Sequence, residues 1–392
     1  MKKLLMVTTI PMILETWLKG QPKFLSQHFE VEVVTSSSAT NSAIAAEEGV
    51  PVVGIDMSRQ ITPLKDLLSL IRLIRYIRRF KPDIVYSTTP KAGLLTMVAS
   101  FFCAVPVRVH CIVGLPLIEA SGLRRELLVL MERITYFFAT HLYCNSFGLK
   151  TYIEQHLSSK TVKVIANGSV NGVDTTLFND NYSAEQKMQL RQKLSIDDDA
   201  TVLTFIGRIV RDKGVNELIE AFEQLSQRYP SLILLLIGPS EEHLDPVDAQ
   251  TAKCISEHKK IRRIDYLEDV RPYLAISDLF VLPSYREGLP NVLIEAGCFD
   301  LPLIATDING CNEVVIDGEN GLLIEKKSVK SLTDAVSTLL DDDALYERLK
   351  KSVRQSIISR YEQGAFLEAL RTELFAIYEE AHRGKTAREH VS

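Results

Sequence analysis

The stretch Pro283–Ala296 is the most informative part of this sequence and reads Pro-Ser-Tyr-Arg-Glu-Gly-Leu-Pro-Asn-Val-Leu-Ile-Glu-Ala. The residues before it, Asp278–Leu282, form an apolar run that is typical of a buried parallel strand. A helix is predicted from Asn291 to Cys298, because Pro290 favours a helix start. Glu287 should therefore lie in the loop at the carboxyl end of a strand, where open α/β sheets bind ligands.

Glu295 should lie about one turn into the predicted helix, near the loop that carries Glu287. A carboxylate accepts hydrogen bonds from sugar or ribose hydroxyls, and the free amides at a helix start favour an anion. The stretch therefore predicts acceptors for hydroxyl groups beside a seat for a phosphate. The alternative is that two acidic residues near a helix start stabilise the helix without any ligand.

A second motif, Gly207–Gly214, reads Gly-Arg-Ile-Val-Arg-Asp-Lys-Gly and follows the apolar run Val202–Ile206. Apolar residues recur at helical spacing from Val215 onward, so this is also a strand–loop–helix crossing. Arg208 and Lys213 on this loop could bind phosphate oxygens, although a solvated turn would carry the same residues. The two crossings together favour a nucleotide diphosphate-sugar as the ligand.

The C-terminal half resembles the family 4 glycosyltransferases, which are retaining enzymes of the GT-B fold. The resemblance is carried by four elements: Gly207–Gly214, Asp278–Pro283, Ser284–Glu295 and Gly318–Leu323. The N-terminal half resembles the branch that assembles capsular, O-antigen or lipid-linked oligosaccharides. The segments that carry this second resemblance are Arg59–Pro63, Thr89–Gly93 and Gly168–Asp174.

The resemblance implies a role for each matching residue. Arg208 and Lys213 would hold the donor diphosphate, Glu287 would contact the donor sugar, and Glu295 would contact the ribose. The predicted donor-binding set is Gly207, Arg208, Lys213, Glu287, Gly288, Leu289, Pro290, Asn291, Val292 and Glu295. The predicted catalytic set is Glu287, Arg208, Lys213 and His110.

The N-terminal half departs from the family pattern at two places. Val113 precedes Gly114, where many relatives have a histidine or an acidic residue, which leaves the catalytic role of His110 open against a packed structural one. The loop after the first strand, Thr8–Met12, has no glycine and so no Gly-rich dinucleotide fingerprint, which argues against an NAD enzyme. Thr89, Lys91 and Glu119 are the candidates for acceptor binding, with Lys91 directed at an acceptor phosphate.

The fold class predicted from the order of elements is α/β, with two doubly wound Rossmann-like domains facing a cleft. We predict an acceptor-binding domain over 1–180 and a nucleotide-sugar-binding domain over 181–362. The family resemblance implies that a helix over 363–382 crosses back to the first domain, and the tail 383–392 should be disordered. In the second half, strands are predicted at Val202–Ile206, Leu232–Ile237, Arg263–Leu267, Leu279–Leu282, Leu303–Ala305 and Gly321–Ile324.

Composition places the chain among ordinary globular proteins: 392 residues, 46% hydrophobic and 24% charged. The formal net charge of -5 gives no reason to expect nucleic acid as a partner. The six cysteines show no paired spacing, and we interpret them as reduced core residues of a cytosolic protein. The aspartate triplets at 197–199 and 341–343 are interpreted as solvated loops, so no metal and no other cofactor is expected.

The segment Lys65–Lys81 is amphipathic and basic, with one apolar face and arginines elsewhere. Arg124 and Arg125 add positive charge before a second apolar helix, Leu127–Phe138. Such charge attracts anionic lipid headgroups or a lipid diphosphate, while a solvated helix face explains it equally. Peripheral contact with the inner face of the cytoplasmic membrane is therefore a hypothesis, and no transmembrane segment is expected.

These features and the family resemblance together predict a retaining glycosyltransferase. It would move a hexose or N-acetylhexosamine from a nucleotide sugar, most simply a UDP-sugar, to a glycan or a lipid-diphosphate-linked acceptor in surface polysaccharide synthesis. Two alternatives stay open on the sequence alone. One is a nucleotide-sugar 2-epimerase of GT-B fold, which would need no acceptor. The other is a non-catalytic nucleotide-sugar-binding subunit, which would bind the donor without transferring the sugar.

Overall fold

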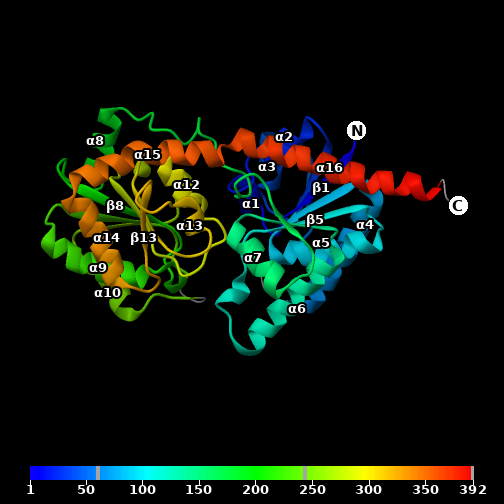
Figure 1. The fold of residues 1–392 in the computed structure, drawn as a ribbon, viewed down its shortest axis with the longest axis horizontal. Helices are drawn as coiled ribbons and strands as arrows, with labels where there is room; N and C mark the ends of the chain where they lie inside the picture. The colour runs from blue at the N-terminus through cyan, green and yellow to red at the C-terminus, as the bar shows by residue number, and fades with distance from the viewer. Residues whose placement is uncertain (59–61, 242–244, 390–392) are drawn as a thin grey trace. The chain divides into compact units, whose positions relative to one another are not determined.

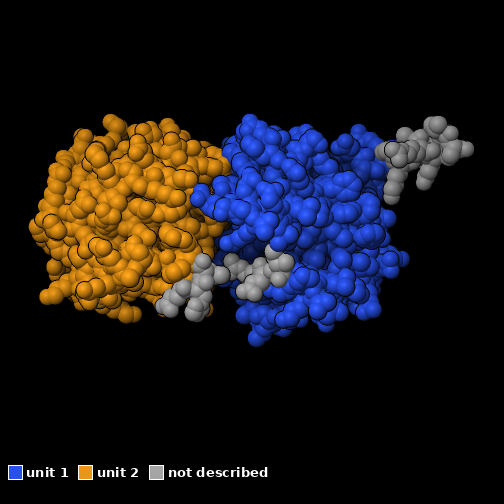
Figure 2. All heavy atoms as spheres, turned by 90° about the horizontal axis from the view of Figure 1, so that it is seen from below, with its two compact units in different colours: residues 1–172, 363–392 blue, residues 173–362 orange. Residues whose placement is uncertain are grey.

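The structure is a computed structural model and describes residues 1–58, 62–241 and 245–389, with side chains up to Arg383. The described chain divides into two compact units, residues 1–172 with 363–392 and residues 173–362 (Figures 1 and 2). Each unit contains a wholly parallel sheet with helices packed against it, which confirms the predicted α/β class. Of the segment Arg59–Pro63, residues 59–61 lie outside the described residues.

Unit 1 is built on a seven-stranded sheet of order β3-β2-β1-β4-β5-β6-β7. Its strands are β1 (Lys3–Val7), β2 (Glu30–Thr35), β3 (Val52–Gly54), β4 (Ile84–Thr88), β5 (Val107–Ile112), β6 (His141–Cys144) and β7 (Val162–Val164). Its helices are α1 (Met12–Glu15), α2 (Gln21–Ser26), α3 (Asn41–Glu48), α4 (Pro63–Phe80), α5 (Pro90–Phe102), α6 (Gly122–Phe138), α7 (Phe147–His156) and α16 (Gln363–Glu389), with a 3-10 turn η1 (Pro116–Ile118).

Alternate residues of these strands enter different cores, as the pleat of a strand requires. Leu5 and Val85 belong to one buried cluster with residues of α4, α5 and α6, whereas Leu4 and Ile84 belong to another. That second cluster includes Phe366, Leu370 and other residues of α16. The last helix is therefore part of the core of unit 1, although it follows unit 2 in the sequence.

Unit 2 is built on a six-stranded sheet of order β10-β9-β8-β11-β12-β13. Its strands are β8 (Thr201–Ile206), β9 (Leu232–Ile237), β10 (Ile261–Ile264), β11 (Leu279–Leu282), β12 (Leu303–Thr306) and β13 (Gly321–Ile324). Its helices are α8 (Ala184–Lys193), α9 (Val215–Arg228), α10 (Ala249–Glu257), α11 (Arg271–Leu274), α12 (Asn291–Gly297), α13 (Cys311–Val314), α14 (Val329–Asp341) and α15 (Asp343–Tyr361), with a 3-10 turn η2 (Arg211–Lys213).

The chain passes between the units at 172/173 and 362/363, whereas the first boundary is predicted at 180/181. The physical reason is the packing of residues 173–182, since Val173 is buried in the core of unit 2 and Phe178 and Tyr182 pack against it. The Val173 amide also donates to the Tyr361 carbonyl at 2.7 Å, so the two connecting segments are hydrogen-bonded to each other.

Three other predictions differ from the structure in their bounds or their character. The strand predicted over Arg263–Leu267 begins earlier, because Ile261 pairs with Leu234 while Tyr266 is exposed. The residues 383–389 continue α16 instead of forming a disordered tail, and 390–392 lie outside the described residues. In the second aspartate triplet, 341–343, Asp342 caps α15 by accepting from the Leu345 amide, so these aspartates lie at helix ends and not in a loop.

Candidate functional site

Two loops of unit 2 lie at the point where its strand order reverses. Strands β8 and β11 are neighbours, but the chain builds outward from β8 to β9 and β10 on one side and from β11 to β12 and β13 on the other. The loops 207–214 and 283–290 leave the carboxyl ends of these two strands. In parallel sheets this is the position at which ligands bind, and it holds both sequence motifs.

Close backbone contacts join these two loops. Gly214 has a φ of +69°, and a Cβ placed on it would lie 2.0 Å from the Pro283 carbonyl oxygen. The Tyr285 amide donates to the Asp212 carbonyl at 2.8 Å, and the Tyr285 hydroxyl donates to Glu217 Oε1 of α9 at 2.6 Å. Because only glycine permits this approach, the pairing of the loops depends directly on Gly214.

A third loop, after β12, holds the backbone that carries Glu287. Asn309 Nδ2 donates to the carbonyls of Glu287 and Gly288 at 3.1 and 3.2 Å. A Cβ on Gly310, which has a φ of +79°, would lie 2.0 Å from the Gly288 carbonyl oxygen. The position of Glu287 is therefore set by backbone contacts on both sides.

Three cationic side chains and three carboxylates form ion pairs on and beside these loops. Lys213 Nζ lies 2.5 Å from Glu287 Oε1, and Arg208 Nη1 lies 2.6 Å from Glu241 Oε2. Arg286 Nη2 lies 2.6 Å from Asp212 Oδ2, while Arg208 Nη2 is 3.8 Å from Asp212 Oδ1. The predicted residues Arg208, Lys213 and Glu287 are thus brought together, and their charges are balanced without a ligand.

Glu295 differs from these carboxylates because it makes no hydrogen bond or ion pair with the described part of the chain. It lies in α12, and its side chain is only partly accessible. Dense surroundings raise its pKa to about 7, with desolvation as the cause. An enclosed carboxyl group with unused acceptor atoms can be satisfied by hydroxyl groups of a ligand.

The remaining residues of the predicted donor set lie around the same loop. Gly207 follows β8, and Gly288 and the buried Leu289 precede Pro290 at the start of α12. Asn291 and Val292 form the first turn of that helix, as predicted. Glu241, Arg286 and Asn309 were not among the predicted site residues. The signal for Glu241 was its place just after β9, the strand beside β8.

The predicted acceptor residues Thr89 and Lys91 lie at the corresponding reversal point of unit 1, between β1 and β4. Thr89 Oγ1 and Thr9 Oγ1 are 2.6 Å apart. Thr89 has φ 77° and ψ 144°, a conformation that costs a non-glycine residue about 1–3 kcal/mol. Lys91 is only 6% exposed and forms an ion pair with Asp66 of α4, so an acceptor phosphate at Lys91 would have to compete with that carboxylate.

His110 and Glu119 occupy very different surroundings in unit 1. His110 is 1% exposed, its Nδ1 lies 3.0 Å from Ser87 Oγ, and its ring packs against Gly93 of α5. Burial lowers the pKa of His110 to about 4, so the imidazole is neutral at pH 7. Glu119 is exposed at the end of η1. The catalytic role of His110 and the acceptor role of Glu119 stay predictions.

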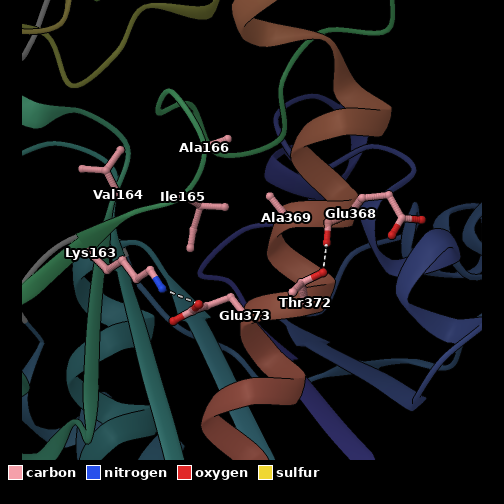
Figure 3. A pocket seen from close by; sticks show the side chains of 8 residues that line it. All are labelled: Lys163, Val164, Ile165, Ala166, Glu368, Ala369, Thr372 and Glu373. Carbon is pink, nitrogen blue, oxygen red and sulfur yellow. Dashed lines mark hydrogen bonds and ion pairs between the residues drawn. The ribbon is translucent and has the colours of Figure 1, made fainter.

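A solvent-open cavity of about 380 Å³ in unit 1 lies apart from these residues (Figure 3). It is lined by Lys163, Val164, Ile165, Ala166, Glu368, Ala369, Thr372 and Glu373. Lys163 and Glu373 form an ion pair with each other, and the Tyr143 hydroxyl donates to Glu373 at 3.2 Å. Because these polar groups form ion pairs and hydrogen bonds with one another, the cavity offers few unpaired donors or acceptors to a ligand.

Neither a metal cluster nor a membrane-spanning helix is found within the described ranges. No group of three or more His, Cys, Asp or Glu side chains there is arranged to hold a metal ion. No helix in the same part of the chain is both long and apolar enough to cross a membrane.

Comparisons with known proteins match both units. A family model described as "Glycosyl transferases group 1" matches residues 186–356, and one described as "Glycosyl transferase 4-like domain" matches residues 24–168. The capsular polysaccharide biosynthesis glycosyltransferase CapM of Staphylococcus aureus is 30% identical over 357 residues, which are 90% of this chain and 92% of CapM.

A second relative is the UDP-Gal:alpha-D-GlcNAc-diphosphoundecaprenol alpha-1,3-galactosyltransferase of Escherichia coli. It is 29% identical over 314 residues, which are 78% of each chain. Among solved structures, HepE of Anabaena in complex with UDP and glucose superposes with a TM-score of 0.78 at 19% identity, over 95% of this chain and 100% of HepE. By its fold and its near full-length similarity to CapM, the chain belongs to the family 4 glycosyltransferases of GT-B fold.

Proposed function

We propose that this glycosyltransferase moves a hexose or N-acetylhexosamine from a UDP-sugar to a glycan or lipid-diphosphate-linked acceptor in surface polysaccharide synthesis. The observation that carries the proposal is the gathering of Arg208, Lys213 and Glu287 on two adjoining loops, followed in the next helix by Glu295, which has no partner among the described residues. The E. coli relative uses UDP-galactose and a diphosphoundecaprenol acceptor by its name, and the HepE structure contains UDP. Both relatives support a UDP-sugar donor.

In the proposed reaction, the bond between the sugar C1 and the UDP oxygen breaks, and its electron pair stays on the diphosphate. Arg208 and Lys213 stabilise the growing negative charge, and Glu287 orients the sugar through its hydroxyls. The acceptor hydroxyl oxygen bonds to C1 on the face that UDP leaves, and its proton passes to the leaving diphosphate oxygen. This front-face course retains the anomeric configuration. These cations supply the positive charge, so we expect no metal requirement.

The donor assignment is tested by calorimetric binding of UDP and GDP with and without EDTA. We expect UDP binding that EDTA leaves unchanged. Arg208→Ala should weaken UDP binding about tenfold to a hundredfold, because a charge-assisted hydrogen bond contributes about 1.5–3 kcal/mol. Arg228→Ala is the matched control, since that arginine pairs with Asp341 at the surface of the same unit. An Arg208→Ala affinity within threefold of wild type would refute the phosphate role.

Exposed apolar residues on two helices of unit 1 support the membrane hypothesis. The α4 residues Leu64, Leu67, Leu68 and Ile71 are all exposed and recur at i, i+3, i+4 and i+7. On α6, Leu123 and Phe137 are also exposed, and Arg124 and Arg125 lie beside Leu123. An exposed apolar row with flanking arginines fits the interface of an anionic membrane, where a lipid-linked acceptor would be presented.

This surface is tested by sedimentation with liposomes at low salt. The wild-type protein should sediment with vesicles that contain phosphatidylglycerol and less with purely zwitterionic ones. Leu67→Asp should reduce that binding several-fold without lowering the melting temperature, because Leu67 is exposed. Equal sedimentation with both kinds of vesicle, or none with either, would remove the membrane from the proposal.

A further inference from the structure

Arg208 already forms an ion pair within the protein, with Glu241. Its Nη1 lies 2.6 Å from Glu241 Oε2, and the two side chains are 35% and 22% exposed. Glu241 comes from the loop after β9, the strand on the opposite side of β8 from β11. It therefore reaches Arg208 from a loop that belongs to neither of the two sequence motifs.

The two carboxylates near Arg208 are held in different ways. Asp212 pairs with Arg286 at 2.6 Å, and its backbone amide donates to Asp245 Oδ2 at 2.7 Å. Glu241 has Arg208 as its one recorded side-chain partner among the residues that the structure describes. Asp212 is therefore fixed by several contacts, whereas Glu241 can leave Arg208 by breaking a single partly exposed pair.

We infer that Glu241 is a displaceable counter-ion that competes with the donor diphosphate for Arg208. The inference rests on the proposed function and adds a residue to the same site. Nη1 cannot keep its short contact with Glu241 while it donates to a phosphate oxygen in the same direction. A carboxylate left beside the bound diphosphate would also be repelled by it. Donor binding thus exchanges one ion pair for another, and re-formation of the Arg208–Glu241 pair favours the release of UDP after transfer.

The opposite role for Glu241 predicts the opposite result. If Glu241 stayed on Arg208 and orientated the guanidinium toward the phosphate, its neutralisation would loosen Arg208 and weaken binding. The two roles are distinguished by the sign of the affinity change in Glu241→Gln, a substitution that keeps the shape of the side chain and removes its charge.

The experiment is calorimetric titration of UDP into the full-length wild type, Glu241→Gln and the control Asp265→Asn. Asp265 is exposed and pairs with Arg263 at 3.4 Å, so the control also removes one negative charge and one arginine partner from unit 2. We expect Glu241→Gln to bind UDP about three- to tenfold more tightly, because a partly exposed pair no longer has to be broken. Asp265→Asn should match the wild type.

Each result decides the inference. Unchanged or weaker UDP binding by Glu241→Gln, with normal binding by the wild type, would overturn the role of Glu241 and leave the proposed function standing. An equal gain in Asp265→Asn would assign the effect to overall charge and also overturn it. If the wild type bound no UDP at all, the proposed donor site and this inference would both be refuted.

Discussion

Glu287 and Glu295, eight positions apart in the sequence, have different electrostatic surroundings. Glu287 pairs with Lys213 at 2.5 Å, whereas Glu295 has no cationic partner in the part of the chain that the structure describes, and burial raises its pKa to about 7. If Glu295 accepts hydrogen bonds from the ribose hydroxyls, as the family resemblance implies, ligand binding should depend on pH near neutrality. The difference between the two residues therefore has measurable consequences for binding and for stability.

Lowering the pH from 8 to 6 should weaken UDP binding by the wild type several-fold, because protonated Glu295 loses acceptor capacity. Isothermal titration at several pH values should also show proton release on binding near pH 7. Glu295→Gln should bind UDP more weakly at pH 8 and show a flatter dependence on pH. A steep dependence that survives in Glu295→Gln would assign the titration to another group.

The same pKa shift predicts a change in stability with the opposite sign. The native state holds the proton of Glu295 more tightly than the unfolded chain does, so native stability falls as the pH rises from 4.5 through about 7. In the absence of ligand, Glu295→Gln should be more stable than wild type at pH 8 by about 1–2 kcal/mol, after discounting for the partial exposure of the group. Denaturant unfolding at pH 5 and pH 8 tests this, and no gain at pH 8 would contradict it.

At the scale of elements, the site is held together by glycines that let one loop touch the backbone of the next. Gly214 contacts the Pro283 carbonyl, and Gly310 contacts the Gly288 carbonyl. Gly214 and Gly310 both have a positive φ, and a Cβ added to either would lie 2.0 Å from the carbonyl oxygen that it contacts. These contacts join the ends of β8, β11 and β12. The spacing of the charged residues therefore depends on backbone approach and not on the charges themselves.

Gly214→Ala should lower both the stability of the chain and its affinity for UDP, because a methyl group would push the 207–214 loop away from Pro283. We expect a loss of about 2–4 kcal/mol in unfolding free energy. Gly318→Ala is the matched control, since Gly318 has a similar φ of +71° but nothing within 4 Å of the added Cβ. It should cost about 1 kcal/mol and leave UDP affinity unchanged.

Helix α4 shows that one amphipathic segment can carry two apolar faces. The sequence predicts a single apolar face over 65–81, but the structure buries Leu73 and Ile77 and exposes Leu64, Leu67 and Leu68. Leu73→Ala should destabilise the protein by about 2–5 kcal/mol through an internal cavity. Leu67→Ala should change the unfolding free energy by less than about 0.5 kcal/mol. Equal losses in the two variants would show that the outer row is also buried in solution.

At the scale of the whole molecule, the chain completes its first unit with its last helix. Leu370 and Leu374 of α16 are fully buried against strands of unit 1, and Lys2 lies over the rings of Phe375 and Tyr378. Folding of unit 1 therefore needs residues that are separated from it by the whole of unit 2. Among the described residues, both core clusters of unit 2 are drawn from 173–362 alone.

Leu370→Ala should accordingly increase amide hydrogen exchange in β1, β4 and β5 while exchange in β8, β9 and β11 stays as in the wild type. The expected loss of about 2–5 kcal/mol is that of a buried leucine. Thr372→Ala, at an exposed position of the same helix, is the control and should leave both units unchanged. Faster exchange in both units would show that they unfold as one.

By itself the sequence determined the α/β class, nearly every strand, and the two loops that carry Arg208, Lys213, Glu287 and Glu295. It could do so because apolar runs and helical spacing are local patterns, and because ligand loops follow strand ends in parallel sheets. The return of the last helix to the first unit was implied by the family resemblance alone, and the structure confirms it.

Only the tertiary structure decided how the charges are paired. Glu241 meets Arg208 across 33 positions of sequence, and Lys91 meets Asp66 across 25. Neither partner belongs to the motif that it neutralises. Ion pairs of this kind depend on which strands become neighbours and how far each loop reaches, and neither property is a local one. The same reason applies to Glu295, which has no partner among the described residues because of the packing around α12 and not because of its neighbours in the sequence.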